Sequence, residues 1–450
     1  MQASSLAGAI RREAPANLRL ALPLIAAQVS FVAMGTVDTI LAGRLSADAL
    51  AAVAVGSNVW FLPFVFFMGV FMAVSPIVAQ RVGAGHAAER TGLFVRGAIV
   101  VALALGVLWT LILQVIADPV LDLLALTPPV RAMSEGYLRV LAFAGAPFCL
   151  CFVLRSAAEA HGLPRIPLAA GATGLTFNAG AAWILMYGKF GLPALGPVGT
   201  ALATLAAAWV MVGVYAIAFA RSSTLRRLAL WRWQRPRMDG DMFEIASVGG
   251  PIALILTAEA WLFIIGGLLM ARFGGEVVAA HQIAINVASL SFMVPLSIGL
   301  ATAVRVGHAA GAGRSEDVAL RGRAGMLLGA AFALVSATIM ALVPGGIVAI
   351  YTDAPGVAGL AAHFLAFAAV FQLADCVQAT ANGALRGVKD TRVPMLITVG
   401  AYWIVGLPLS AWLAFRTALG PSGIWAGFIA GLAIAAFGLS WRFLHRAPLG

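Results

Sequence analysis

Residues 363–385 read HFLAFAAVFQLADCVQATANGAL, an apolar run long enough to cross a bilayer that carries one carboxylate, Asp375. Two further stretches have the same character: residues 22–43 contain Asp38, and residues 249–271 contain Glu259. A charged side chain at the centre of a membrane helix costs about 3 kcal/mol on insertion scales, so it normally faces a cavity or a partner. Acids in that position typically bind protons or cations. The three stretches therefore favour a transporter over a membrane-anchored enzyme.

The composition places most of the chain in a membrane. Of its 450 residues, 62% are hydrophobic and 10% are charged, whereas a soluble domain is about half apolar and about a quarter charged. Apolar runs of about 20 residues, each able to span the hydrocarbon core, recur along the sequence. We predict twelve membrane helices, at 18–41, 50–79, 93–116, 136–154, 166–187, 197–220, 245–271, 277–304, 324–349, 357–385, 393–415 and 421–441.

The net charge of +11 reflects topology rather than a surface for nucleic acid. If the N-terminus is cytoplasmic, the outer loops and helix ends hold six of the 29 Lys and Arg residues, and the cytoplasmic side holds the other 23. The six are Arg44, Arg131, Arg139, Lys189, Arg272 and Arg416. This asymmetry satisfies the positive-inside rule. We expect a multi-pass protein of the inner or plasma membrane with both termini cytoplasmic.

The two halves of the chain repeat each other at an offset of about 224 to 228 residues. Gly83-Ala84-Gly85 matches Gly311-Ala312-Gly313, and Gly196-Pro197-Val198-Gly199 matches Gly420-Pro421-Ser422-Gly423. Each copy holds six helices, an even number, so both copies enter the membrane from the same side as parallel repeats. The predicted fold is all-α, with two parallel six-helix repeats around a central cleft. We expect an N-terminal lobe at 1–220, a basic cytoplasmic linker at 221–243 and a C-terminal lobe at 244–450.

Four stretches resemble the multidrug and toxic compound extrusion (MATE) family, most closely its NorM-like branch. They are VDTILAGRLSADALAAVAVG (37–56), SPIVAQRVGAGHAAER (75–90), AAHQIAINVASLSFMVPLSIGLATAVRVGHAAGAG (279–313) and QLADCVQATANGALRGVKDTRVPM (372–395). The resemblance implies a cation-coupled antiporter that exports organic cations and drugs. It also implies that Asp38, Asn178, Glu259 and Asp375 serve cation coupling. Some relatives carry Tyr one turn before the acid of the tenth helix, but this chain has Phe371, which brings no hydroxyl.

Two helix faces are candidates for lining a cavity. Around Asp375, the residues Phe371, Gln372, Gln378 and Asn382 fall at −4, −3, +3 and +7, within about 60° of one another on a helix. A second face runs along the eighth predicted helix and consists of Gln282, Asn286, Ser289 and Met293. The flexible Met side chain of this face suits ligands of varied apolar shape. We predict substrate contacts from both faces. The alternative for each is hydrogen bonding between membrane helices, which Gln and Asn often provide.

Glu259 and Asp375 fall at similar depths in the C-terminal half. Two neighbouring carboxylates in a low dielectric do not both stay ionised without a counter-ion. No Lys or Arg lies in the middle of these helices, so we expect the pair to share a proton or an Na+ ion, which makes Glu259 and Asp375 a candidate Na+ site. The alternative is that neighbouring hydrogen-bond donors satisfy both acids.

The sequence predicts no enzyme, no cofactor beyond the coupling ion, and no Walker motif of an ATP-driven pump. We expect H+- or Na+-driven export of small organic cations by a monomer surrounded by lipid. The first alternative is a lipid-linked oligosaccharide flippase of the same superfamily, which would favour extra helices and basic cavity residues. A membrane enzyme acting on lipids is a second alternative, but it would need clustered His and Asp motifs that the sequence lacks. A passive channel is a third, and it would show uncoupled conductance.

Overall fold

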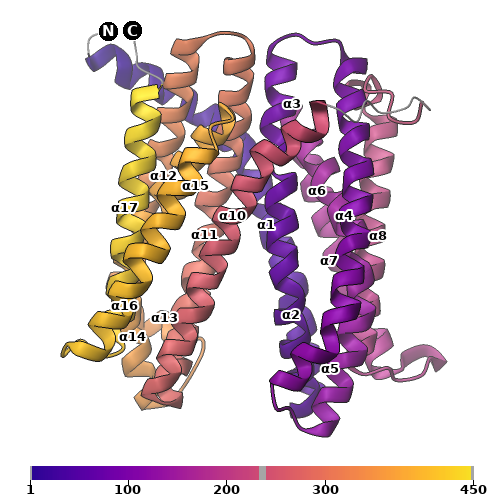
Figure 1. Cartoon of the computed structure of the whole chain (residues 1–450), viewed down its shortest axis with the longest axis vertical. Helices are drawn as coiled ribbons and strands as arrows, with labels where there is room; N and C mark the ends of the chain where they lie inside the picture. Colours follow the sequence, from indigo (N-terminus) through magenta and orange to yellow (C-terminus); the bar gives the residue numbers. More distant parts are fainter. Residues whose placement is uncertain (1–2, 233–239, 447–450) are drawn as a thin grey trace. The chain divides into compact units, whose positions relative to one another are not determined.

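The computed structural model describes residues 3–232 and 240–446, and these residues form helices and short connections with no strand. Residues 233–239 of the predicted linker lie outside the described part. The first half holds α1 (Ala3–Leu45), α2 (Ala47–Phe71), α3 (Val74–Gly83), α4 (Ala88–Leu123), α5 (Pro128–Leu141), α6 (Gly145–Ala160), α7 (Arg165–Tyr187), α8 (Pro197–Arg221) and the short α9 (Ser223–Arg226). The second half holds α10 (Gly240–Met270), α11 (Gly275–Gly311), α12 (Ser315–Leu342), α13 (Pro344–Val348), α14 (Pro355–Gly387), α15 (Arg392–Gly400), α16 (Leu407–Arg416) and α17 (Ser422–Arg446) (Figure 1).

Twelve of the helical segments in the described part are long and apolar enough to cross a membrane. Each coincides with one of the twelve predicted spans, so the predicted all-α membrane class is confirmed. In a bilayer the backbone must satisfy its own hydrogen bonds, which a continuous helix does. The first described turns of α1 and the last turn of α17 lie at the same end of the fold (Figure 1).

Three of the spans are interrupted, and the sequence pattern did not predict these interruptions. The second span breaks between α2 and α3 at Met72 and Ala73, and the fourth contains a 3₁₀ turn at Ala142–Ala144 between α5 and α6. The eleventh contains a π-helical turn, η4 (Ala401–Gly406), between α15 and α16. A π-helical turn inserts an extra residue into the helix and is frequent at functional sites.

Two compact units emerge from the contacts within the chain. One unit contains Pro23–Val78 and His86–Ala253; the other contains the residues up to Leu22, the segment Ala79–Gly85 and the chain from Leu254 onward. We call them the N-terminal and C-terminal units. The predicted lobes at 1–220 and 244–450 stay a prediction, since these units are defined by contacts alone.

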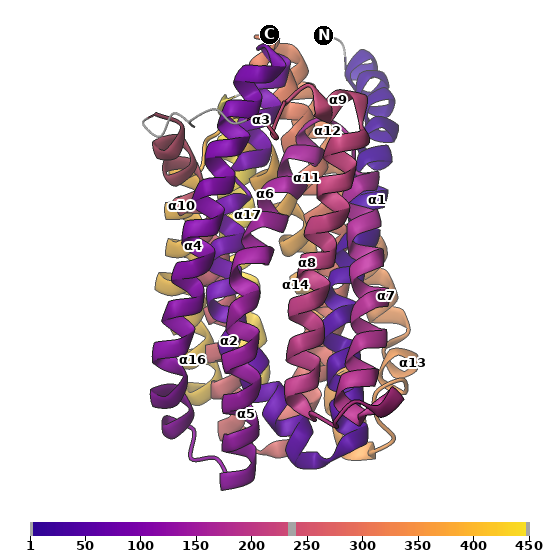
Figure 2. The same cartoon turned by 90° about the vertical axis from the view of Figure 1, so that its right-hand side faces the viewer.

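The core of the N-terminal unit is aromatic. Trp60 and Phe64 of α2 stack with Trp109 of α4 and Phe148 of α6, with ring centroids 4.9 to 6.1 Å apart. Helices α7 and α8 lie side by side and form a long antiparallel pair in the same unit (Figure 2). This pair carries two of the polar residues described below.

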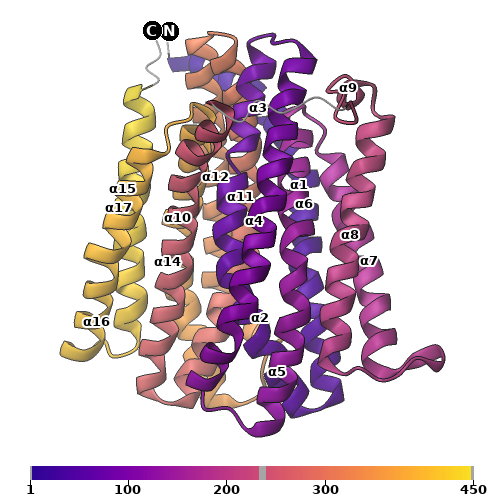
Figure 3. The same ribbon diagram turned by 45° about the vertical axis from the view of Figure 1, so that its right-hand side comes forward.

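The C-terminal unit is built around α11 and α14, which contact each other extensively. They approach so closely that a Cβ on Gly383 would lie 2.3 Å from the carbonyl oxygen of Gly299. Helix α17 packs against α14, α16 and η4 (Figure 3). The first turns of α1 belong to this unit: Asn17 donates to Thr302 Oγ1 at 2.9 Å, and Arg305 donates to the carbonyl oxygen of Glu13 at 2.7 Å.

Candidate functional site

The N-terminal unit holds a short chain of polar side chains from three helices. Asn178 of α7 donates through Nδ2 to Thr204 Oγ1 of α8 at 3.0 Å. The Thr204 hydroxyl in turn donates to Asp38 Oδ2 of α1 at 2.9 Å. Asp38 and Asn178 are buried, with 4% and 0% of their surface exposed. The structure therefore brings Asp38 and Asn178 together through Thr204, a residue that the sequence analysis missed.

Two acceptor oxygens in this chain have no partner among the described residues: Asp38 Oδ1 and Asn178 Oδ1. Leaving a buried acceptor unsatisfied costs about 1–3 kcal/mol, and more when the group is charged. A proton or a metal cation on Asp38 would remove the uncompensated charge. The arrangement is therefore chemically suited to binding one cation.

The C-terminal unit holds the other two acids, on neighbouring elements. Glu259 lies on α10 and is partly buried; Asp375 lies on α14 with 3% of its surface exposed. The two carboxyl groups interact electrostatically, and Asp375 Oδ1 has no hydrogen-bond partner among the described residues. This interaction agrees with their similar depths in the sequence, and the sharing of a proton or an Na+ ion stays a prediction.

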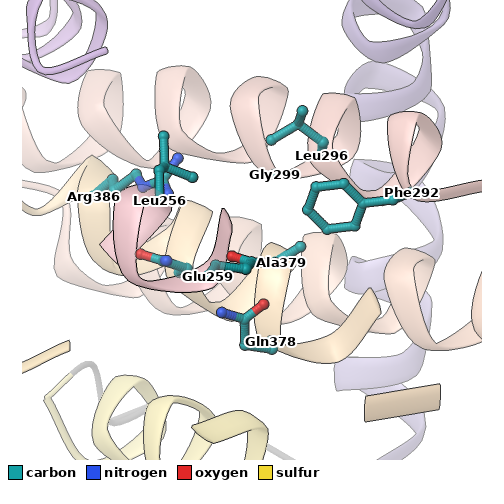
Figure 4. A pocket seen from close by; sticks show the side chains of 9 residues that line it. Leu256, Glu259, Phe292, Leu296, Gly299, Gln378, Ala379 and Arg386 are labelled. Atoms are coloured by element: carbon teal, nitrogen blue, oxygen red, sulfur yellow. The ribbon is translucent and has the colours of Figure 1, made fainter. Parts of the chain in front are cut away.

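A pocket beside Glu259 corrects one expectation of the sequence analysis. Gln378, Asn382 and Arg386 of α14 line this pocket together with Glu259, and Phe292 and Leu296 of α11 form its apolar wall (Figure 4). The Arg386 guanidinium interacts electrostatically with Glu259. The prediction that no Arg or Lys is available to these acids was wrong. The predicted span ends at residue 385, but α14 continues to Gly387, and Arg386 is buried.

The predicted polar face of α14 divides into two parts. Gln378 and Asn382 line the pocket, whereas Gln372 donates to Ser291 Oγ of α11 at 3.0 Å. Ser291 in turn shares a 2.7 Å hydrogen bond with Ser336 of α12. Gln372 therefore takes the alternative role, hydrogen bonding between helices.

Phe371 also packs inside the C-terminal unit. Its ring stacks edge to face on Trp425 of α17 and on Phe263 of α10, with centroids 5.9 Å apart in both cases. With 2% of its surface exposed, Phe371 faces the core rather than a free surface.

The second predicted face lies along α11. Gln282, Asn286 and Ser289 are exposed, and Met293 is half-buried. Asn286 Oδ1 accepts a 2.8 Å hydrogen bond from the Tyr351 hydroxyl, beyond α13. These side chains thus remain available for substrate contacts.

Tyr402 is a further residue near the acids that the sequence analysis missed. It lies in the π-helical turn η4, is 0% exposed, and its hydroxyl has no hydrogen-bond partner among the described residues. The hydroxyl interacts electrostatically with both Glu259 and Asp375. Only the irregular backbone of η4 places it there, and a regular helical pattern gives no signal for that.

The described residues contain no cluster of three or more His, Cys, Asp or Glu side chains suited to a metal ion. Cys149, Cys151 and Cys376 are buried free thiols. Two carboxylates and the amide oxygens of Gln378 and Asn382 are hard oxygen ligands that suit a proton or an alkali ion better than a transition metal.

Comparison with known proteins agrees with this geometry. The model of the MatE family matches residues 23–184 and 251–412, so the two matches begin 228 residues apart (251 − 23). The halves are thus copies of one unit, as their shared motifs predicted. A solved eukaryotic MATE transporter has the same fold, with a TM-score of 0.88 at 20% identity over 96% of each chain.

Two curated bacterial relatives match nearly the whole chain. The multidrug resistance protein PmpM of Pseudomonas aeruginosa is 38% identical over 443 residues, covering 97% of this chain and 92% of that protein. The multidrug resistance protein NorM of Vibrio vulnificus is 36% identical over 448 residues, covering 97% and 96%. The chain therefore belongs to the MatE family, the multidrug and toxic compound extrusion transporters that its sequence resembles.

Proposed function

We propose that this protein is a cation-coupled antiporter that exports amphipathic organic cations and drugs. H+ or Na+ moving inward down its gradient would drive the export. The observation that carries the proposal is the pair of buried carboxylates, Asp38 and Asp375, that each keep one oxygen without a partner among the described residues. The relatives named as multidrug resistance proteins support the substrate class.

The coupling arises because the cationic drug and the coupling cation compete for the same negatively charged carboxylates. A cationic drug is attracted while Glu259 and Asp375 are ionised, and a bound coupling cation removes that attraction. One elementary charge crossing 100 mV releases about 2.3 kcal/mol, before any concentration term is added. Binding of the coupling cation from outside would therefore favour release of the drug there.

We assign the polar residues to two roles within this scheme. Asp38, Asn178, Glu259 and Asp375 would bind the coupling cation, and Glu259 with Asp375 would be the Na+ site if the ion is sodium. The exposed face of α11 and the polar residues of α14 would contact the drug. The substrate-contact set is Gln282, Asn286, Ser289, Met293 and Gln378. Phe371 and Gln372, which the sequence analysis placed in the same set, are buried in contacts between helices and are left out of it. A single chain contains every one of these groups, which supports function as a monomer.

We further propose that the protein spans the inner or plasma membrane with both termini in the cytoplasm. The distribution of Lys and Arg over the loops and helix ends supports this orientation.

The proposal can be tested in proteoliposomes loaded with a fluorescent organic cation, with a sodium or a proton gradient imposed separately. We expect one of the two gradients to drive transport. Asp375→Asn, which keeps the shape of the side chain, should abolish gradient-driven transport while expression and folding persist. Transport by Asp375→Asn at the wild-type rate would remove this acid from the mechanism.

A further inference from the structure

Arg386 is a buried cation in a place where the proposed function calls for acids. Only 6% of its surface is exposed, and its Nε has no hydrogen-bond partner among the described residues. It lines the same pocket as Glu259, Gln378 and Asn382 (Figure 4). Guanidinium groups stay protonated in proteins, so this positive charge is permanent. Burying a charged group whose Nε–H donates to no acceptor is costly, so the position of Arg386 calls for a physical explanation.

Arg386 lies on the same face of α14 as Asp375. The polar and charged side chains on this face form a line about three helical turns long, which we call the ladder. Counted from Asp375, its other members are Gln378 at +3, Asn382 at +7 and Arg386 at +11. Glu259 of α10 lines the pocket together with Gln378, Asn382 and Arg386 of this ladder, whereas Asp375 is not part of the pocket lining. Within the described residues, no direct ion pair joins Arg386 to Glu259 or Asp375, although Arg386 and Glu259 interact electrostatically. The guanidinium therefore acts on Glu259 electrostatically rather than through a direct ion pair, and Asp375 Oδ1 has no hydrogen-bond partner among the described residues.

The charges of the cluster formed by Arg386, Glu259 and Asp375 can be counted; Arg386 and Glu259 line the pocket, and Asp375 interacts with Glu259 from outside its lining. Glu259 and Asp375 supply two negative charges when ionised, and Arg386 supplies one positive charge. Tyr402 of η4 and Cys376 of α14 are neutral neighbours that interact with the acids. Helix α11 contributes Phe292, Leu296 and Gly299, none of which ionises. The cluster thus has one excess negative charge.

We propose that Arg386 is the fixed counter-charge of this site, and that it limits the site to one monovalent cation. The proposal rests on the cation-coupled function above. In a buried site, interactions between charges are screened far less than in water. One bound H+ or Na+ makes the cluster neutral, whereas a second would leave it positive. Arg386 therefore sets how many coupling cations the C-terminal unit carries in each cycle.

The first test compares wild type, Arg386→Gln and Arg386→Lys as purified full-length proteins. The number of bound cations is measured by ²²Na+ binding at fixed pH and by proton uptake after a downward pH jump. Arg386→Gln should bind one cation more per protein than wild type, with an apparent affinity for the first cation at least about tenfold higher. Arg386→Lys keeps the charge and should retain the wild-type number, with an affinity within about threefold.

A second test uses the acids and does not depend on the Arg386 variants folding. Glu259→Gln or Asp375→Asn leaves one carboxylate and Arg386 in the cluster, which is then neutral, so either change alone should remove the cation bound at this site. If Arg386 did not count toward the charge, the remaining acid would still bind a cation in each variant. Cation binding by the single-acid variants would overturn the proposal.

The outcomes separate this inference from the proposed function. If wild type neither binds nor responds to H+ or Na+, the antiport proposal itself fails. If wild type couples normally and Arg386→Gln keeps the wild-type number of cations and the wild-type affinity, only the role of Arg386 is overturned. A purely structural arginine would lower thermal stability in Arg386→Gln and leave the number of bound cations unchanged.

Discussion

At the scale of single residues, Thr204 is the link that the sequence did not indicate. A Thr in an apolar helix gives no signal of its own, because Thr commonly bonds back to its own helix. Here its hydroxyl instead joins Asn178 to Asp38 across three helices. The three acids stood out because buried charge is costly. Neutral partners such as Thr204 become visible only once the helices are packed.

Replacing Thr204 tests that link. Thr204→Val keeps the shape of the side chain but removes the hydroxyl, so Asp38 and Asn178 both lose their partner. We expect a stability loss of about 1–3 kcal/mol and impaired efflux. Thr204→Ser keeps the hydroxyl and should retain both properties. Thermal unfolding in detergent and transport in proteoliposomes give the two readouts, and wild-type behaviour of Thr204→Val would show that the link is dispensable.

Tyr402 offers a second prediction at this scale, because its hydroxyl is buried and has no hydrogen-bond partner in the described part of the chain. A hydroxyl needed only for packing should be dispensable, so Tyr402→Phe would keep or slightly raise thermal stability. If the hydroxyl helps to hold the coupling cation at Glu259 and Asp375, cation affinity should fall about tenfold, the size expected for one hydrogen bond to a charged group. Titration of drug binding against Na+ and pH measures this effect. An unchanged affinity would mean that the acids act without Tyr402.

At the scale of the elements, the sequence predicted the spans but not their irregular turns. Length and hydropathy identify a membrane helix, and all twelve predicted spans have a counterpart in the described residues. The π-helical turn η4 (residues 401–406, AYWIVG) ends two residues before Pro408, which has no N–H to donate to the carbonyl oxygen of residue 404. Hydropathy and spacing do not report how backbone and side-chain groups pair in such a place. For the same reason, the hydrogen bond from Gln372 to Ser291 could not be separated from cavity lining by spacing alone.

The contact between α11 and α14 gives a prediction about packing. In an isolated helix, Gly383→Ala would gain about 1 kcal/mol, since Ala is the better helix former. Its Cβ, however, would lie 2.3 Å from the Gly299 carbonyl oxygen, so the two backbones must separate. We expect the clash to dominate, with a net loss of about 1–3 kcal/mol. Thermal unfolding in detergent measures the effect.

Gly267→Ala provides the matched control for this prediction. Gly267 lies on α10 in the same unit, and a Cβ there meets nothing within 4 Å. This variant should be as stable as wild type or slightly more so. If Gly383→Ala were equally stable, the close approach of α11 and α14 would not limit the fold.

At the scale of the whole molecule, the repeat could be predicted because the short Gly- and Pro-containing motifs of the first half recur in the second half. The three acids do not recur in this way. The two family matches have equal length, yet Asp38 corresponds to Gly266 at their offset of 228 residues. The positions of the unit boundaries could not be predicted, because hydropathy does not report which neighbours a long helix contacts. Glu13 and Asn17, for example, hold the start of α1 to α11 of the C-terminal unit.

The orientation of the molecule in the membrane provides the last prediction. The three native cysteines are buried, so a cysteine introduced on the surface can be labelled against a low background. Ser223 and Asp353 are exposed and lie in connections separated by an odd number of spans. The orientation that we propose from the Lys and Arg asymmetry predicts Ser223 in the cytoplasm and Asp353 outside. A membrane-impermeant maleimide should therefore label Asp353→Cys in intact cells, and Ser223→Cys only in inverted vesicles. The reverse pattern would place both termini outside and reverse the direction of the proposed transport.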